Sequence, residues 1–431
     1  MKELIDQEVN NLIQKELIRQ KEVLNLIPSE NYCSEEVLKA CGSVLNNKYS
    51  EGYPKKRYYQ GHAFIDDIEI LAIERAKKLF KAEHVNVQSY SGSPANMQIY
   101  HALLKPNQKI MGMRLDMGGH LTHGHTVNFS SRYFQSVQYP VDKETETLDM
   151  ELIRNIALQE KPNILVSGAT AYPRVIDFKQ FHEIAEEVGA YSMADISHIA
   201  GLVATDIHPS PFPFTDVVMT TTHKTLRGPR GAMIMCKKVD RLANLEGLDE
   251  KQRDQESNLA SKIDRSVFPG LQGGPHMHSI AGKAIAFKEA LQPDFKLYSQ
   301  QIIKNAKALA NSLMENDIKL VTNGTDNHLI LIDLRPLGIG LGKPIAKSLE
   351  KAGICTNCNT VPYDPSTPFK PSGIRIGTPI LTTRGMKEQE MNLLGDWMSK
   401  VIKDPDNRDL QKNISNQVKA LCAEFPVYGD Q

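Results

Sequence analysis

Short apolar runs alternate with helix-like stretches between residues 161 and 231, and this alternation leaves the chain few possible folds. Runs 164–166, 190–194 and 217–220 have the length of buried strands, and stretch 178–188 has helical spacing. Strands that alternate with helices form a parallel sheet covered by helices. Ligands bind such sheets outside the carboxyl ends of the strands. The sequence therefore predicts an α/β fold with its functional site at that edge.

Two of these runs end on side chains with chemistry suited to that edge. Run 190–194 ends on Asp195, and run 217–220 leads through a hydroxyl-rich turn to His223 and Lys224. Partial burial disfavours a charged ammonium and lowers its pKa. A lysine there is a candidate for Schiff-base formation with a carbonyl compound, above all pyridoxal phosphate, whose enzymes also place a carboxylate against the pyridinium nitrogen. A surface lysine just past a strand end is the alternative interpretation.

An earlier turn supplies a third part of such a site. A strand ends just before Ser91-Gly92-Ser93, and Pro94 suits the first turn of the amphipathic helix that follows. Amide and hydroxyl groups at a helix N-terminus bind phosphate. The turn, the aspartate and the lysine, all at ends of expected parallel strands, together indicate a pyridoxal-phosphate site.

Several further motifs extend the same pattern along the chain. They are LIPSEN, YSEGYPKKRYYQG, SGSPAN, GGHLTHG, TTTHKTLRGPRG, FPGLQGGPH and SGIRIGTP. Together they resemble the serine hydroxymethyltransferase family over roughly residues 26–428. The resemblance implies a fold type I pyridoxal-phosphate enzyme, in which a large domain with a mostly parallel seven-stranded sheet is joined to a smaller C-terminal α/β domain. We expect an N-terminal arm at 1–55, the large cofactor-binding domain at 56–284 and the small domain at 285–431.

The resemblance also implies an activity. It is the reversible transfer of the hydroxymethyl carbon of L-serine to tetrahydrofolate, through a pyridoxal-phosphate aldimine, which gives glycine and 5,10-methylenetetrahydrofolate. A folate-independent β-hydroxy amino acid aldolase of the threonine type is the rival enzyme, and Glu51 with the folate-pocket residues separates the two. A cofactor-free scaffold or nucleic-acid-binding regulator is the other rival. The presence of Lys224, Asp195, Glu51 and Arg375 without a basic run argues against it.

Matching positions give each site residue an implied role. Catalytic roles are implied for Lys224, Glu51, His223, Asp195 and Tyr59. Cofactor contacts are implied for Ser91, Gly92, Ser93, His120, Thr170, Asp195, His198, Thr221, Lys224, Tyr49, Gly273, Gly274 and Arg230. Substrate contacts are implied for Ser29, Glu51, Tyr59, His198 and Arg375. Folate contacts are implied for Leu115, Leu121 and Asn359.

Some of these residues lie in segments that suit a subunit interface. Segment 47–61 is rich in tyrosine and has neither helical nor strand period, which is typical of a binding or subunit surface, although a solvated loop is the alternative. The resemblance implies that Tyr49 and Tyr59 reach a neighbouring active site and that Gly273 and Gly274 cap the partner's cofactor phosphate. A homodimer or tetramer is therefore expected. The helix predicted over residues 2–24 could pack on its own subunit, but the resemblance favours an arm across the partner.

Composition limits the other partners. The chain has 51 Lys and Arg against 51 Asp and Glu, which indicates neither a nucleic-acid nor a membrane partner. Six scattered cysteines in 431 residues are typical of free thiols, and the charged N-terminus does not resemble a signal peptide. We therefore expect a cytoplasmic protein.

We assign no metal-binding or catalytic role to three remaining features of the sequence. His120, His123 and His125 lie close together without a neighbouring carboxylate ligand, so no metal is expected. Cys355 and Cys358 form a lone CxxC and are interpreted as structural. The highly charged segment 240–264 is expected to be an exposed excursion.

Overall fold

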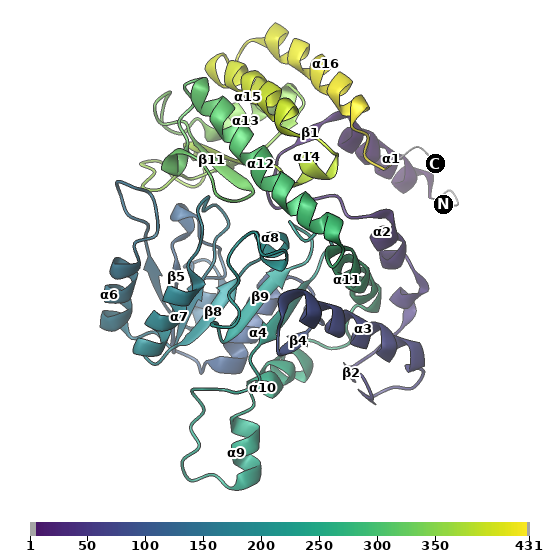
Figure 1. Cartoon of the computed structure of the whole chain (residues 1–431), viewed down its shortest axis with the longest axis vertical. Coiled ribbons are helices and arrows are strands. Elements are labelled where there is room, and N and C mark those ends of the chain that lie inside the picture. Colours follow the sequence, from purple (N-terminus) through teal and green to yellow (C-terminus); the bar gives the residue numbers. More distant parts are fainter. Residues whose placement is uncertain (1–5, 429–431) are drawn as a thin grey trace. The chain divides into compact units, whose positions relative to one another are not determined.

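A computed structural model describes residues 6–428, and the chain divides into two compact units (Figure 1). One unit is Cys33–Gln300; the other joins the chain up to Tyr32 to the chain from Gln301 onward. This division differs from the predicted boundaries at 55 and 284. The N-terminal segment joins the C-terminal unit because β1 (Leu24–Asn25) pairs in parallel with β12 (Ile354–Cys355). Residues 1–5 of the expected arm and 429–431 of the expected small domain lie outside the described part.

The unit Cys33–Gln300 contains a seven-stranded sheet with the order β4-β10-β9-β8-β7-β5-β6. The strands are β4 (His84–Asn86), β5 (Lys109–Met113), β6 (Gln135–Tyr139), β7 (Ile164–Ser167), β8 (Tyr191–Asp195), β9 (Val217–Thr221) and β10 (Ala232–Cys236). Strands β6, β5, β7, β8 and β9 are parallel, and only β10 runs antiparallel to its neighbours β9 and β4. The predicted mostly parallel seven-stranded sheet is confirmed, and with it the α/β fold.

The same unit contains helices, several of which pack an apolar face on the sheet. They are α2 (Glu35–Cys41), α3 (Ala63–Phe80), α4 (Gly92–Leu103), α5 (Phe129–Tyr133), α6 (Met150–Glu160), α7 (Phe178–Glu187), α8 (Ala200–Ala204), α9 (Glu250–Glu256), α10 (Leu259–Arg265) and α11 (Met277–Ala290). Ile99 of α4 and Ile263 of α10 share one buried cluster with Val166, Met193 and Met219 of the strands. Alternate strand residues point to one face of a sheet, so α4 and α10 cover that face.

The prediction for segment 240–264 is wrong in part. Helix α9 is exposed and extends away from the sheet, as expected (Figure 1). Leu259 and Ile263 of α10, however, are 1% and 0% exposed and belong to the core. They lie one helical turn apart, so α10 is a short amphipathic helix. Its charged neighbours in the sequence obscure this pattern.

Two separate helices follow one another between residues 277 and 315. Helix α11 ends at Ala290, and α12 (Pro293–Glu315) begins at a proline. Proline lacks the backbone N–H that a residue in a helix interior donates. In the first turn that N–H has no partner within the helix, so proline is favoured there. Pro293 therefore starts a new helix.

The other unit is smaller and is built of short strands and helices. Its strands β11 (Leu329–Asp333), β14 (Gly373–Gly377) and β13 (Asn357–Asn359) form an antiparallel sheet. Its helices include α1 (Gln7–Glu22), α13 (Gly342–Lys351), α14 (Pro379–Thr383), α15 (Glu388–Lys403) and α16 (Arg408–Glu424). Leu24 and Leu26 are completely buried in its core with Trp397 of α15. The expected α/β character of the C-terminal part is confirmed.

Most apolar side chains of helix α1 are exposed. Val9, Leu12, Ile13 and Ile18 are 46–65% exposed, and α1 has no buried residue. The helix predicted over 2–24 is confirmed from Gln7 to Glu22, and residues 2–5 lie outside the described residues. Its expected place across a partner stays a prediction.

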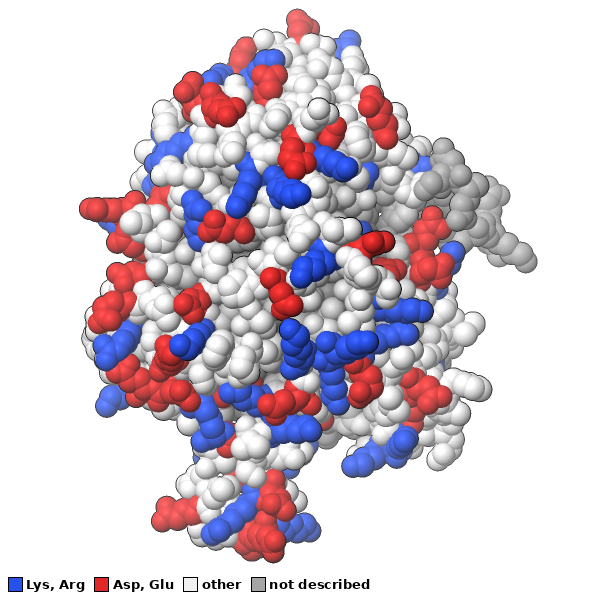
Figure 2. All heavy atoms as spheres, viewed as in Figure 1, with Lys and Arg blue, Asp and Glu red and all other residues white. Residues whose placement is uncertain are grey.

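Charges of both signs are interspersed on the face drawn in Figure 2. Within residues 6–428, no helix combines the length and the apolar character that a membrane crossing requires.

Candidate active site

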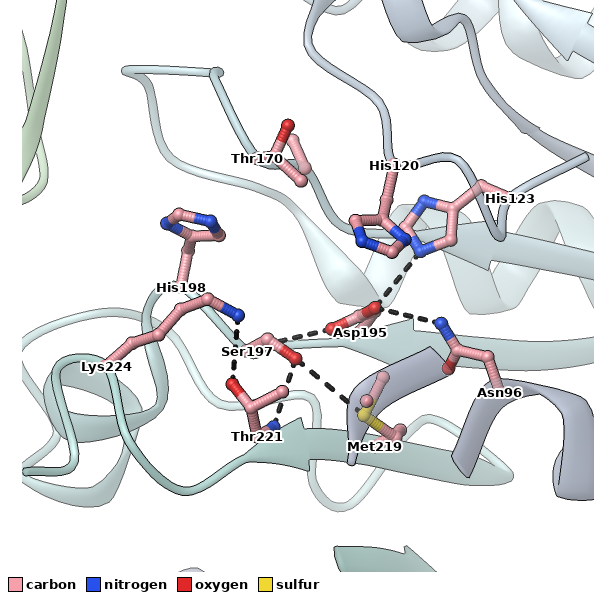
Figure 3. Close-up of a pocket in the computed structure, with 12 residues that line it drawn as sticks. Asn96, His120, His123, Thr170, Asp195, Ser197, His198, Met219, Thr221 and Lys224 are labelled. Atoms are coloured by element: carbon pink, nitrogen blue, oxygen red, sulfur yellow. Dashed lines mark hydrogen bonds and ion pairs between the residues drawn. The ribbon is translucent and has the colours of Figure 1, made fainter. Parts of the chain in front are cut away.

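A pocket lies at the carboxyl ends of the parallel strands. Asp195 ends β8, Thr221 ends β9, and Thr170 follows β7 on a loop, so the sheet brings them together as the strand pattern predicted. The lining residues are Gly92, Asn96, His120, His123, Ala169, Thr170, Asp195, Ser197, His198, Met219, Thr221 and Lys224 (Figure 3).

Asp195 is a buried carboxylate held by three donors. His123 Nε2 lies 3.1 Å and Asn96 Nδ2 3.2 Å from its Oδ2, and the backbone N–H of Ser197 donates to Oδ1 at 3.1 Å. Burial alone would raise the pKa of Asp195, but the hydrogen bond from His123, the attraction of His123 and His120, and the Ser197 contact hold it well below its ordinary value. An ionised carboxylate only accepts hydrogen bonds, so Nε2 of His123 carries the proton.

Lys224 places the amine in the pocket. Its Nζ donates to Thr221 Oγ1 at 3.0 Å, and in Figure 3 the amine points into the pocket. The preceding residue, His223, does not line this pocket in the described part of the chain. Burial, with the positive charges of Lys224 and Arg230, lowers the pKa of His223 to about 3. His223 is therefore neutral near pH 7 and is suited to packing or hydrogen bonding rather than to carrying charge.

His120 lies above Asp195 in Figure 3 with its ring orientation fixed. Its Nδ1 accepts from the backbone N–H of Thr122 at 3.2 Å and lies 2.7 Å from the hydroxyl of the same residue. The Thr122 hydroxyl already accepts from Asn96 at 2.7 Å, so its own proton points to His120. Thr170 donates to the carbonyl of Gly119 at 3.0 Å, which holds its loop beside His120.

The turn before α4 contributes Gly92 to the pocket lining. Gly92 is the first residue of α4, and the N-cap Ser91 makes no side-chain capping hydrogen bond. The first amides of a helix have no partner within it. A Cβ at Gly92 would lie 2.8 Å from Thr221 Cγ2, so only glycine fits here without displacing the Thr221 side chain.

A second cluster of predicted residues lies in the same unit, outside this pocket's described lining. The Tyr49 hydroxyl donates to Glu51 Oε1 at 3.2 Å, and the rings of Tyr49 and Tyr59 meet edge to face at 5.4 Å. A Cβ at Gly273 would lie 3.1 Å from Glu51 Oε1, and Gly274 contacts Tyr49 in the same way. Tyr49 is 57% and Tyr59 49% exposed. The structure thus brings together residues 49, 51, 59, 273 and 274 on the surface.

The remaining predicted residues are distributed over both units. Arg230 is exposed, Leu121 is 40% exposed, and Leu115 begins a short 3-10 helix, Leu115–Met117. Ser29, Asn359 and Arg375 belong to the smaller unit. Arg375 lies in the middle of β14 and donates from Nε to Asn357 Oδ1 at 3.1 Å. Burial lowers its pKa to about 10, so it remains charged at neutral pH.

Comparison with known proteins gives a consistent answer. A family model described as serine hydroxymethyltransferase matches residues 2–398. A protein of that name from Desulfotalea psychrophila (strain LSv54) is 53% identical over 424 residues, which cover 98% of this chain and 95% of the relative. One from Nostoc sp. (strain PCC 7120) is 52% identical over 423 residues, with the same coverage of both chains.

The chain belongs to the serine hydroxymethyltransferase family. Its reaction is the transfer of the hydroxymethyl carbon of serine to tetrahydrofolate, with glycine as the other product. It is a pyridoxal-phosphate enzyme of one-carbon metabolism with the type I fold. The predicted family, fold, reaction, cofactor and co-substrate are thereby confirmed.

The pocket fits the cofactor of the serine hydroxymethyltransferase family. An ionised carboxylate suits the protonated ring nitrogen, a primary amine suits the aldehyde, and a glycine turn at a helix N-terminus suits the phosphate. Within residues 6–428, no group of three or more His, Cys, Asp or Glu side chains is arranged to hold a metal ion.

Sequence reasoning missed several residues that shape this pocket. Asn96 and His123 hold Asp195, and Met219 lines the wall. The motifs SGSPAN and GGHLTHG contain Asn96 and His123, but these residues are 99 and 72 positions away from Asp195 along the chain. His123 was considered only as a metal ligand, and its carboxylate partner lay too far away in sequence to be recognised.

Proposed function

We propose that the pocket between Lys224 and Asp195 is where this chain carries out its hydroxymethyl transfer. One observation carries the proposal: of the twelve described lining residues, Lys224 alone has a primary amine, and it shares the pocket with the ionised Asp195. Pyridoxal phosphate, when bound, supplies an electron sink for negative charge at the amino acid's α-carbon. The protein's own residues supply binding, orientation and proton transfer.

Each pocket residue has a distinct task in this proposal. Asp195 holds the ring nitrogen in its protonated form, and His123 and Asn96 keep the carboxylate oriented and charged. The Lys224 amine anchors the cofactor, with Thr221 Oγ1 fixing its direction. The flat ring of His120 covers the cofactor and helps exclude water. The Ser91-Gly92-Ser93 turn binds the phosphate through its amides, with Thr170, His198 and Arg230 nearby in the family pattern.

Proton transfer at the serine hydroxyl is proposed for Glu51. General acid–base catalysis needs a titratable side chain whose position is fixed, and Tyr49 donates to the Glu51 carboxylate at 3.2 Å. That hydrogen bond raises the pKa of the Tyr49 hydroxyl, so Tyr49 stays a donor. Tyr59 packs beside it. His223 is neutral and is proposed to pack beside Lys224.

The cluster around Glu51 is proposed to serve the pocket of a second copy of the chain. Its tyrosines are about half exposed, although aromatic side chains usually bury their faces. They do not line the Lys224 pocket of their own chain in the described residues. The exposed apolar side chains of α1 provide further uncovered surface. These features support a homodimer, or a tetramer of such dimers, with Gly273 and Gly274 facing the partner's phosphate.

Mixed dimers test the shared site. Lys224→Ala and Glu51→Gln are each expected to be inactive alone, but a mixture unfolded and refolded together should recover about one quarter of wild-type activity, because half of the dimers are hybrids with one intact site. Activity is assayed after dimers are verified by light scattering. Absence of recovery in verified hybrids would contradict a site shared between chains. Refolding each variant by itself is the control.

The substrate carboxylate is proposed to bind Arg375, Ser29 and His198. A buried guanidinium forms strong bidentate pairs with carboxylates, and Arg375 is desolvated enough for its pKa to fall. Arg375→Lys is expected to raise the KM for serine by about 10–100-fold, because one charged, directional pair is lost. Cofactor affinity should not change. Arg335→Lys, whose guanidinium pairs with Asp333 of β11, is the matched control, and an unchanged KM in Arg375→Lys would exclude the role.

The last two parts of the proposal concern the folate contacts and the cellular compartment. Leu115, Leu121 and Asn359 are proposed to contact the folate, as their positions in the family pattern imply. All six cysteines are free thiols, which suits a reducing compartment such as the cytoplasm.

A further inference from the structure

Arg57 is a buried arginine whose hydrogen bonds surround the backbone of Glu51. It ends the second strand of a small hairpin, β2 (Gly52–Tyr53) and β3 (Lys56–Arg57), that begins directly after Glu51. Its side chain is 3% exposed. Burying a guanidinium costs free energy unless its donors are hydrogen-bonded. The hydrogen-bond partners of Arg57 therefore show which segments it holds in place.

One nitrogen of Arg57 holds the carbonyl groups on both sides of Glu51. Nη1 donates to the carbonyl oxygen of Ser50 at 2.9 Å and to that of Gly52 at 2.7 Å. The carbonyl of Glu51 itself accepts from the backbone N–H of Tyr58 at 3.2 Å. Three consecutive carbonyl groups are thus fixed by the hairpin, and they set the direction in which the Glu51 side chain leaves the backbone.

The other nitrogens of Arg57 are fixed to α3. Nε donates to Asp66 Oδ1 at 2.9 Å, and Nη2 donates to Glu69 Oε2 at 2.6 Å. The Glu69 side chain is 1% exposed, and its other oxygen accepts from Gln88 Nε2 at 2.7 Å. Gln88 Nε2 also donates to the Gly52 carbonyl at 3.0 Å. The guanidinium therefore ties the Glu51 loop to a long helix and to the segment that follows β4.

The loop needs this support because the Glu51 side chain is only partly buried and because Gly52 is conformationally constrained. Gly52 has φ +96°, and a Cβ there would lie 2.4 Å from the Lys56 carbonyl oxygen. The Glu51 carboxylate accepts a hydrogen bond from Tyr49, which is itself exposed. Packing alone does not fix these side chains, so the backbone must.

We propose that Arg57 is a positioning residue for the reaction: it holds the Ser50–Gly52 backbone so that Glu51 and Tyr49 present a preorganised acid–base pair to the substrate pocket. The inference rests on the proposed function of Glu51. Arginine is required because one planar group must donate in three directions at once. A lysine at this position keeps a charge for Glu69 but offers one nitrogen on a flexible stem.

A double-mutant cycle tests the inference. Glu51→Gln is expected to lower kcat by about 10²–10⁴-fold, as for loss of a general acid–base. Arg57→Lys should lower kcat by about 10–100-fold, because a small displacement of a catalytic group costs that much. In the double variant, kcat should stay within about threefold of Glu51→Gln alone, because Arg57 acts through Glu51. A merely structural arginine would give losses that multiply.

Two further readouts separate positioning from damage. The affinity for pyridoxal phosphate, measured by titration of its absorbance, should fall less than kcat does in Arg57→Lys, since the side chains that line the Lys224 pocket are unchanged. Arg154→Lys, at a surface pair with Glu187, is the matched control and should leave kcat unchanged. Should Arg57→Lys fold poorly, Asp66→Asn loosens the guanidinium at a more exposed partner, 16% exposed. Its smaller kcat loss must likewise vanish in the Glu51→Gln background.

The outcomes distinguish the two claims. A wild-type kcat in Arg57→Lys, or multiplicative losses in the double variant, would overturn the inference while leaving the role of Glu51 intact. A wild-type kcat in Glu51→Gln would overturn the proposed role of Glu51, and the inference with it.

Discussion

Replacing Lys224 by alanine is expected to lower kcat by about 10⁴-fold or more, since the pocket then has no amine to anchor the cofactor or to move a proton. In the described lining, no other side chain can substitute, because the remaining residues offer hydroxyl, imidazole, amide, thioether or carboxylate groups. Thr221 would also lose the donor that Lys224 provides at 3.0 Å.

Covalent attachment gives a second measurement of Lys224. Borohydride reduction of the wild-type holoenzyme should fix the cofactor to the peptide that contains Lys224, detected by mass spectrometry. The variant should give no such peptide. Lys109→Ala is the matched control, because Lys109 begins β5 and pairs with Glu160 at the other end of the sheet. Label on a different lysine of the wild-type enzyme would show that the pocket assignment is wrong.

Asp195→Asn is expected to lower kcat by about 10²–10³-fold while the protein still folds and binds cofactor. Asparagine keeps the shape of the side chain but removes the charge that holds the ring nitrogen protonated. Because contacts with His123 and Ser197 keep the pKa of Asp195 depressed, the carboxylate stays ionised at neutral pH and well below it. The wild-type rate should therefore show no titration of Asp195 in the working pH range.

The control for Asp195 is another buried aspartate of the same sheet. Asp216 precedes β9 and pairs with Arg241 at the strand end opposite to the pocket. Asp216→Asn should lower the thermal midpoint, because a buried pair loses one charge, but should leave the cofactor spectrum and kcat unchanged. Equal kcat for Asp195→Asn and wild type would remove Asp195 from the mechanism.

The sequence could predict this pocket because parallel strands bring their carboxyl ends to one edge. Asp195 and Thr221 end neighbouring strands, and Lys224 follows one of them, so their approach depends only on correct strand assignment. The turn at Gly92 could be predicted as well, because it depends only on neighbouring residues in the sequence, a strand before it and a helix after it.

Other features were not predictable because they depend on contacts between distant segments. The hydrogen bonds of Asn96 and His123 to Asp195 join three separate segments, and no spacing along the chain encodes them. The pairing of Leu24 with Ile354 moved the N-terminal segment into the C-terminal unit. Helix α10 was hidden because only two large apolar residues, Leu259 and Ile263, mark its buried face.

The most direct test of the account is the visible absorption spectrum of the wild-type enzyme, recorded with glycine and then with glycine and tetrahydrofolate. We expect a cofactor band in the resting enzyme and a strong longer-wavelength band, from the amino acid that has lost its α-proton, only when both ligands are present. A resting band that does not respond to tetrahydrofolate would contradict the folate-dependent reaction and favour an aldolase. Absence of any cofactor band after addition of pyridoxal phosphate would contradict the pocket itself.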